Sequence, residues 1–341
     1  MSDQTPAPER AGTAQTAQQN TSMSLNPISS GPSPPKPIQQ PQGYGIGRRT
    51  HKKSRTGCAT CKSRKIKTYS TLTADPSLWD FWRDDVVRLG LSRDYIMRAV
   101  LAVSALHLAY HRPDRRDFYT AQGILLHQKA SRSAMRCMAA GKDMDKDEAA
   151  SLFLFSMLTI FFALACPRRS QPDGSFFIGE SGFPDWAFLL SGCRSLSDHV
   201  LGERGMETVA APFLVYGRKR YLASYQAILD EKAKAGPDAK ESTLLAPLRQ
   251  RIAAAVSDPD LLQRYTHALD QLELALVVRQ NPDTPRDVLD AMVWLWMVSE
   301  TLVPLLKVPT QTQEAVAIFA HYSILLKHNE SHWWLQGWGT T

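Results

Sequence analysis

Two cysteines lie close together inside a strongly basic part of this sequence. Cys58 and Cys61 form a C-x2-C pair, a spacing at which a tight turn can direct two thiolates at one tetrahedral zinc ion. Redox use of such a pair normally requires a strand, a turn and a helix, which a tract of Lys and Arg does not supply. The pair therefore predicts a zinc-binding turn with Cys58 and Cys61 as metal ligands.

The segment 48–67 that contains this pair carries the excess positive charge of the chain. The net charge is +7 over 341 residues, whereas residues 1–47 are balanced and residues 68–341 hold 29 basic and 31 acidic side chains. Each Lys or Arg that neutralises a phosphate releases a counterion, so the segment predicts binding to a polyanion. From charge alone, a solvated tail or a nuclear-import signal remains an equal alternative. The basic residues, with no acidic one among them, are Arg48, Arg49, Lys52, Lys53, Arg55, Lys62, Arg64, Lys65 and Lys67.

Other patterns that could do chemistry are weak. Asp143, Asp145 and Asp147 alternate as at the start of a calcium loop, but Glu148 occupies the glycine position and Leu154 the position of the bidentate glutamate. No set of acid, base and nucleophile is recognisable, so we expect no enzyme. The scattered histidines, His107, His111, His199 and His267, are interpreted as helix-surface or core residues rather than ligands or bases. The C-terminal tryptophans, Trp333, Trp334 and Trp338, are interpreted as core or interface packing rather than a ligand cage.

The rest of the chain predicts an all-α protein. Residues 1–47, with eight Pro and seven Gln, cannot bury enough apolar surface to offset their ordering entropy, which predicts a disordered tail. Asp75 followed by Pro76 is a helix start signal, because the carboxylate caps free N–H groups and proline needs none. Helical periodicity and Pro, Gly or Asn breaks then predict helices over 94–111, 114–140, 149–166, 185–201, 206–235, 241–256, 258–280, 285–307 and 311–328.

Residues 149–166 could form either a membrane span or a buried helix. This 18-residue stretch carries no charge, a length at the lower edge of what crosses a bilayer, and Arg168 and Arg169 follow it. A single membrane span and a central helix of an all-α core both fit the pattern. Neither a secretory signal nor a second such stretch is present, and five cysteines in a chain of this length predict a reducing compartment.

Residues 53–67, KSRTGCATCKSRKIK, resemble the opening of the fungal Zn2Cys6 binuclear-cluster transcription factors. In that family six cysteines hold two zinc ions, and the resemblance implies that Cys58 and Cys61 match the first two ligands. The third ligand would occupy position 68, where this chain has Thr68, and the next cysteine is Cys137. Two thiolates cannot hold two zinc ions, so the intact cluster is not expected here. The simplest hypothesis is that coding sequence between Lys67 and Thr68 has been lost.

The resemblance also implies how the basic residues meet DNA. In the family a short helix after the second cysteine places its N-terminal end in the major groove, typically at a CGG half-site. Arg64 and Lys65 match the pair that reads base edges, since both donate to the O6 and N7 acceptors of guanine. Lys62 and Lys67 match positions that contact phosphates or flank the helix.

Further blocks resemble the all-helical regulatory domain of the family, in the version found in sterol uptake control regulators. These blocks cover residues 72–119, 149–167, 176–196 and 314–338. These blocks favour a buried helix over 149–166 rather than a membrane span. The resemblance implies a nuclear protein with a helical regulatory domain over 68–341. It also implies an apolar ligand such as a sterol, and a possible homodimer. The first hypothesis is a DNA-binding regulator of RNA polymerase II transcription. The alternative is a truncated interaction protein that lacks specific DNA binding.

Overall fold

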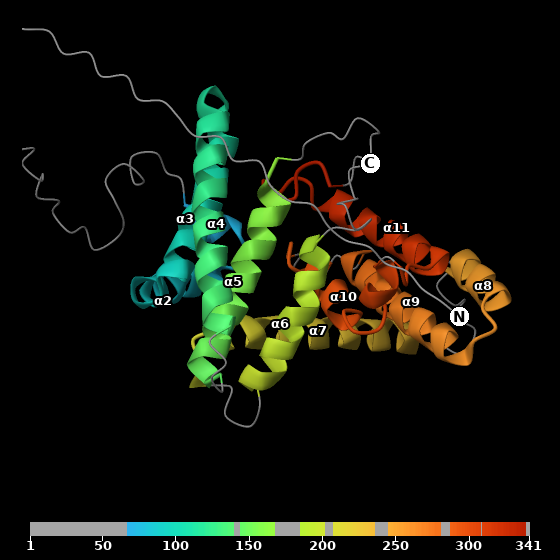
Figure 1. Cartoon of the computed structure of the whole chain (residues 1–341). Helices are drawn as coiled ribbons and strands as arrows, with labels where there is room; N and C mark the ends of the chain where they lie inside the picture. Colours follow the sequence, from blue (N-terminus) through green and yellow to red (C-terminus); the bar gives the residue numbers. More distant parts are fainter. Residues whose placement is uncertain are drawn as a thin grey trace, which may run out of the picture. The chain divides into compact units, whose positions relative to one another are not determined.

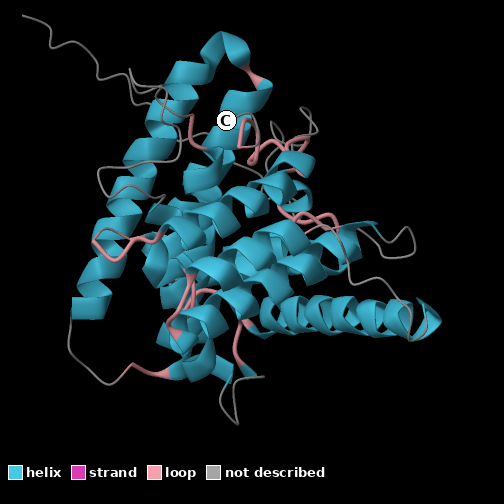
Figure 2. Cartoon of the chain, turned by 90° about the vertical axis from the view of Figure 1, so that its right-hand side faces the viewer, coloured by secondary structure: helices cyan, strands magenta, loops and turns pink. Residues whose placement is uncertain are grey.

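The computed structural model describes residues 67–139, 144–167, 185–201, 207–235, 245–280, 287–307 and 309–338, all within the compact unit Ser54–Thr341. Over these residues every regular element is a helix, so the predicted all-α class is confirmed (Figure 2). The tail over 1–47 and the segment 48–66 lie outside the described residues. The elements are η1 (Thr68–Thr71), η2 (Pro76–Leu78), η3 (Phe81–Asp85), α2 (Val86–Ser92), α3 (Asp94–His111), η4 (Pro113–Arg115), α4 (Arg116–Ala139), α5 (Lys146–Ala165), α6 (Asp185–Leu201), α7 (Ala211–Ala235), α8 (Ala246–Ala255), α9 (Pro259–Gln280), α10 (Asp290–Met297), η6 (Val303–Leu306) and α11 (Gln313–His328).

The predicted start signal at Asp75 is confirmed. Its carboxylate accepts a hydrogen bond from the backbone N–H of Ser77 at 2.8 Å, and Pro76 occupies the first position of η2. The structure that follows is less regular than the helical spacing of its apolar residues predicts. Before α2 begins, η2 is a 3₁₀ turn and η3 is a π-helical turn. This irregular path buries both Phe81 and Trp82, whose side chains are 2% and 4% exposed.

Helices α3 and α4 pack as a close pair, and their bounds agree with the helices predicted over 94–111 and 114–140 (Figure 1). Small residues permit the close approach. A Cβ atom added to Gly123 of α4 would lie 3.2 Å from the carbonyl oxygen of Ala102 in α3, tighter than an ordinary contact. Ala130 and Ala134 of α4 are fully buried in the same direction. Small side chains on α4 therefore allow the backbone and the buried Leu106 of α3 to approach closely.

Helix α5 is the apolar helix that the sequence left ambiguous. It is long and apolar enough to cross a membrane, with a mean hydropathy of 1.9, and 72% of its apolar window is buried within the described structure. Phe153 and Phe161 are both 1% exposed or less, and α5 contacts α3 on one side and α6 on another. Burial on several sides accounts for an apolar surface around most of its circumference.

The C-terminal helices pack around two stacked rings. Trp294 of α10 stacks on Tyr322 of α11 with ring centroids 4.5 Å apart, and both rings are fully buried. Each polar atom has a partner: the indole N–H of Trp294 donates to the carbonyl oxygen of Ala268 at 3.0 Å, and the Tyr322 hydroxyl donates to that of Ala291 at 2.8 Å. These bonds fix α10 against both α9 and α11.

The helix predicted over 285–307 is wrong in its extent. The α-helix ends at Met297, a turn follows, and the chain resumes as the short 3₁₀ helix η6. Pro304 prevents an α-helix from continuing through this region, because its ring would clash with the carbonyl four residues earlier and it lacks an N–H to donate. The α-helix has already ended at Met297, seven residues before Pro304. The first part of the predicted range, 285–286, lies outside the described residues.

The C-terminal tryptophans tie distant parts of the chain together, which confirms their interpretation as packing residues. The indole N–H of Trp333 donates to the hydroxyl of Thr71 at 2.9 Å, and that of Trp334 to its carbonyl oxygen at 3.2 Å. The indole N–H of Trp338 donates to the carbonyl oxygen of Leu164, at the end of α5, at 2.9 Å. The last described residues therefore pack on the first.

Candidate functional site

Lys67 is the one residue of the predicted zinc and DNA-binding segment that the structure describes. Its side chain is exposed, and its carbonyl oxygen accepts hydrogen bonds from the backbone and the hydroxyl of Ser70 at 3.1 and 2.9 Å. The other predicted site residues lie outside the described residues, so their roles stay predictions; they are Cys58, Cys61, Arg48, Arg49, Lys52, Lys53, Arg55, Lys62, Arg64 and Lys65.

Thr68 occupies the position of the third zinc ligand, and it belongs to the helical domain. Its hydroxyl oxygen lies 2.9 Å from Nδ1 of His107, and the His107 ring stacks on Trp333 with centroids 4.5 Å apart. Across the part of the chain that the structure describes, no group of three or more His, Cys, Asp or Glu side chains is placed to hold a metal ion. A donor set of two thiolates followed by this hydroxyl does not fit the two-zinc cluster.

A cavity of about 300 Å³ lies between α5, α6, α7 and α10, and it is the candidate functional site. Its walls are mainly apolar, as in most small-molecule sites. The apolar lining residues are Phe153, Met157, Leu190, Phe213, Leu214, Leu289, Met292, Val293, Trp296 and Met297. Because these residues come from four helices, their pattern in the sequence resembles that of an ordinary dry core.

One side of the cavity is a hydrogen-bonded network between α7 and the start of α10. The Tyr216 hydroxyl donates to Oδ2 of Asp287 at 2.7 Å, and Nε of Arg220 donates to Oδ1 of Asp290 at 3.0 Å. Asp287 is only 4% exposed and also accepts from the backbone N–H of Leu289 at 2.8 Å. Several donors therefore compensate the buried carboxylate of Asp287, as a buried charge requires.

Burial changes the acid–base properties of this network. It raises the pKa of Tyr216, and the hydrogen bond to the Asp287 carboxylate raises it further. Burial also raises the pKa of Asp290, although the adjacent Arg220 guanidinium opposes that shift. The Tyr216 hydroxyl thus remains a protonated donor in the cavity wall.

The same network reaches the N-terminal end of the helical domain. Oδ2 of Asp287 accepts the backbone N–H of Asp75 at 3.3 Å, and Asp75 follows Lys67 by only eight positions. Tyr216 lines the cavity and is linked through Asp287, by two successive hydrogen bonds, to the chain that leads to segment 48–67. A molecule in the cavity that moved Tyr216 would disturb this connection.

Two further arginines line the cavity. Nη1 of Arg194 in α6 donates to the carbonyl oxygen of Met297 at 3.5 Å, and its Nε lies 3.7 Å from Oε1 of Glu300. Arg218 of α7 is exposed and makes no hydrogen bond or ion pair with another described residue. None of these cavity residues was predicted as a site residue from the sequence. The available signal was a single cation within an apolar helix, such as Arg194 after WAFLLSGC, which could have indicated a ligand contact.

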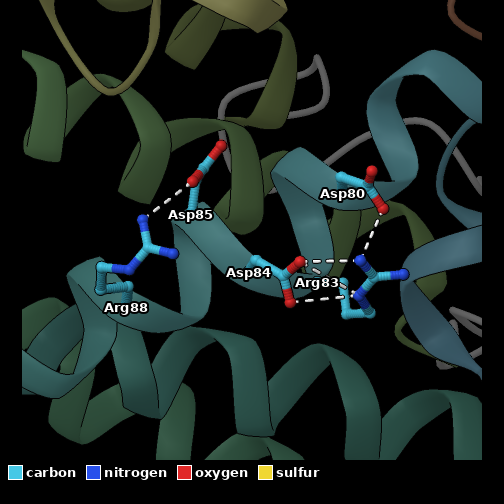
Figure 3. A network of polar contacts seen from close by, with 5 residues as sticks. All are labelled: Asp80, Arg83, Asp84, Asp85 and Arg88. Atoms are coloured by element: carbon cyan, nitrogen blue, oxygen red, sulfur yellow. Dashed lines mark hydrogen bonds and ion pairs between the residues drawn. The ribbon is translucent and has the colours of Figure 1, made fainter. Parts of the chain in front are cut away.

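A separate group of ion pairs on η3 and α2 is structural (Figure 3). Nη2 of Arg83 contacts Asp80 at 2.6 Å and Asp84 at 2.7 Å, while Arg88 contacts Asp85 at 3.2 Å. The side chains are between 39% and 78% exposed, so these contacts are surface pairs that add little stability.

Comparison with known proteins gives one distant relative. A protein from Gibberella zeae described as a Zn(2)-C6 fungal-type transcription factor is 24% identical over 283 residues. This chain is distantly similar to a fungal zinc-cluster transcription factor. The similarity covers 80% of the chain, so it includes most of the helical residues, and the chain spans about half (53%) of that relative's length. No family model matches the chain, and no solved structure matches it.

Proposed function

We propose that this chain is a nuclear regulator of RNA polymerase II transcription, not an enzyme, in which residues 68–341 form a ligand-responsive regulatory domain. The similarity to a transcription factor over 80% of the chain carries the proposal. The cavity of about 300 Å³ supports a small apolar ligand, for which the resemblance to sterol regulators offers a sterol as one candidate. The buried position of α5 supports a protein that works outside a membrane.

The basic segment 48–67 supplies the DNA contact in this proposal. Its nine cations would neutralise phosphates, with Arg64 and Lys65 placed to read guanines if Cys58 and Cys61 hold a zinc ion. Ligand occupancy of the cavity would alter the Tyr216–Asp287–Asp75 connection and with it the chain that leads to segment 48–67. A homodimer would place two such segments on one promoter, as paired half-sites require.

A second function follows from the position of Thr68. Because its hydroxyl bonds to His107 inside the helical domain, the residue is committed to the fold rather than to a metal cluster. In this alternative the chain is a regulatory or interaction protein without specific DNA binding, which competes with a complete relative for ligand or partner.

One titration separates the two functions. The purified chain is titrated with a CGG-containing duplex and with a scrambled duplex, with and without zinc, between 50 and 200 mM salt. Specific binding predicts at least a tenfold preference for the CGG duplex, which zinc increases and the Arg64→Ala/Lys65→Ala variant abolishes. The matched control Arg48→Ala/Arg49→Ala should weaken binding to both duplexes equally.

Equal affinity for both duplexes would exclude specific recognition and support the interaction protein. In that case the slope of log affinity against log salt still reports phosphate contacts, with a magnitude of at most about 8 for nine cations. Failure to bind either duplex at 50 mM salt would contradict the DNA contact itself.

A further inference from the structure

The guanidinium of Arg194, at the wall of the apolar cavity, has few hydrogen-bond and ion-pair partners. A guanidinium has five N–H donors. Here one makes a long hydrogen bond of 3.5 Å to Met297, and the nearest carboxylate oxygen, on Glu300, is 3.7 Å away. The Arg194 side chain is 29% exposed and that of Glu300 58%, so the pair is a weak surface contact. Most of the donor capacity of Arg194 is therefore open to a ligand.

The other two arginines at the cavity, Arg220 and Arg218, differ in how far neighbouring groups pair with their guanidiniums. Arg220 is paired with Asp290 and only 13% exposed, so its charge is already compensated within the wall. Arg218 has no hydrogen bond or ion pair to another described residue. Asp198 and Asp290 also line the cavity, Asp287 bonds to the lining residue Tyr216, and Glu300 lies 3.7 Å from Arg194, so carboxylates are at least as numerous as guanidiniums around this wall. What distinguishes Arg194 and Arg218 is not a net positive wall but guanidinium N–H groups that other described residues leave largely unused.

The apolar part of the cavity has the character of a tail-binding site. Aromatic rings from three helices, Phe153, Phe213 and Trp296, line it together with the flexible side chains of Met157 and Met292. Methionines adapt to irregular apolar surfaces. A volume of about 300 Å³ is at the small end of ligand pockets, which favours a compact or short-chain molecule over a large one.

We infer that the cavity binds an amphipathic carboxylate, with its apolar tail among the aromatic and methionine side chains and its carboxylate on Arg194. Arginine binds a carboxylate with two parallel N–H···O bonds, an arrangement that no present contact of Arg194 provides. Arg218, which is more exposed, draws the anion to the entrance. This inference rests on the proposed ligand response and names its chemical class. A neutral sterol would leave Arg194 without an anion.

The test compares two probes with the same tail. Isothermal titration of the full chain uses dodecanoate below its micelle-forming concentration and the neutral dodecanol below its solubility limit. Dodecanoate should bind at least tenfold more tightly than dodecanol. Arg194→Gln should lower dodecanoate affinity about 10- to 100-fold and leave dodecanol unchanged, since it removes a charge-assisted bond without altering the apolar wall. Arg218→Gln should weaken dodecanoate binding only a few-fold, and more at low salt.

Two control variants test whether the contact between Arg194 and the carboxylate accounts for the affinity. Arg98→Gln on α3, whose cation pairs with Asp94 away from the cavity, should change neither affinity. Met157→Phe, which adds bulk to the apolar wall, should weaken both probes alike, and thermal melting of each variant verifies that it is folded. Equal binding of both probes, or an unchanged dodecanoate affinity in Arg194→Gln, would overturn the inference.

A sterol probe distinguishes this inference from the proposed function. Sterol binding that is tighter than dodecanoate binding and independent of Arg194 would overturn the carboxylate while preserving a ligand-responsive domain. Failure of all three probes to bind would overturn both the carboxylate and the ligand response. The DNA contact would then be judged separately by the duplex titration.

Discussion

The hydroxyl oxygen of Thr68 lies 2.9 Å from Nδ1 of His107, a buried residue of α3. In the zinc-cluster pattern that residues 53–67 resemble, this position would carry the third cysteine. The chain instead begins its helical domain there, with η1 over Thr68–Thr71. Among the described residues, Thr68, the position where the zinc pattern stops, is thus already part of the tertiary contacts of the helical domain.

Restoring a thiol at this position should not restore a two-zinc cluster. Thr68→Cys gives at most three neighbouring thiolates, whereas the family pattern needs six, so we expect no more than one zinc per chain by elemental analysis. The variant should also lose about 1 kcal/mol of stability with the bond to His107. Cys58→Ser/Cys61→Ser is the matched control and should bind no zinc at this segment. Two zinc ions per Thr68→Cys chain would contradict the prediction.

Stability should fall in acid because His107 is buried and His127 is half-buried. Burial lowers the pKa of His107 to about 4, with a smaller contribution from His111, and burial lowers that of His127 to about 4. The unfolded chain, with an ordinary histidine pKa of 6.5, binds these protons more readily, so stability is complete above pH 7 and declines between pH 6.5 and 4. The loss should approach roughly 3 kcal/mol per histidine in urea unfolding.

A substitution identifies the source of that pH dependence. His127→Gln preserves a hydrogen-bonding group next to Thr159 but removes the titrating ring, so its unfolding free energy should vary less between pH 7 and 4.5. His328→Gln, at the exposed end of α11, should retain the full dependence of the parent chain. An unchanged slope in His127→Gln would show that its burial does not contribute.

The Tyr216 hydroxyl should stabilise the cavity wall measurably. Tyr216→Phe leaves the buried carboxylate of Asp287 without a 2.7 Å donor, and we expect a loss of about 1–3 kcal/mol in the free energy of unfolding. Tyr225→Phe on the same helix is the control, because that ring is 50% exposed, and its effect should stay within about 0.5 kcal/mol. Equal losses in the two variants would argue against a role for the Asp287 bond.

The C-terminal tryptophans should matter for more than their apolar area. Trp338→Phe removes the 2.9 Å bond to the carbonyl of Leu164 and leaves space in a site where the ring is 4% exposed. A destabilisation of about 2–4 kcal/mol is expected in denaturant unfolding. Trp79→Phe, whose N–H makes only a 3.5 Å contact to Thr73, should cost less than half as much. A larger effect at Trp79 would contradict this assignment.

The sequence by itself determined the helical class and many helix boundaries. Periodicity and capping signals act over a few residues, so the helices over 94–111 and 185–201 were predicted with the bounds that the structure has. The start signal at Asp75 was equally local. The helix predicted over 285–307 was wrong in its extent, because the α-helix ends at Met297 although the apolar pattern continues towards Pro304. The zinc and DNA-binding roles of segment 48–66 remain sequence predictions.

Only the tertiary structure decided where a ligand could bind. Phe153, Arg194, Tyr216 and Asp290 come from four helices separated by long stretches of chain, and apolar spacing along each helix is the same whether its face meets a dry core or a cavity. The contact of Thr68 with His107, 39 residues away, likewise follows only from the tertiary structure. Local patterns specify helices, whereas sites depend on contacts that only the packing of those helices creates.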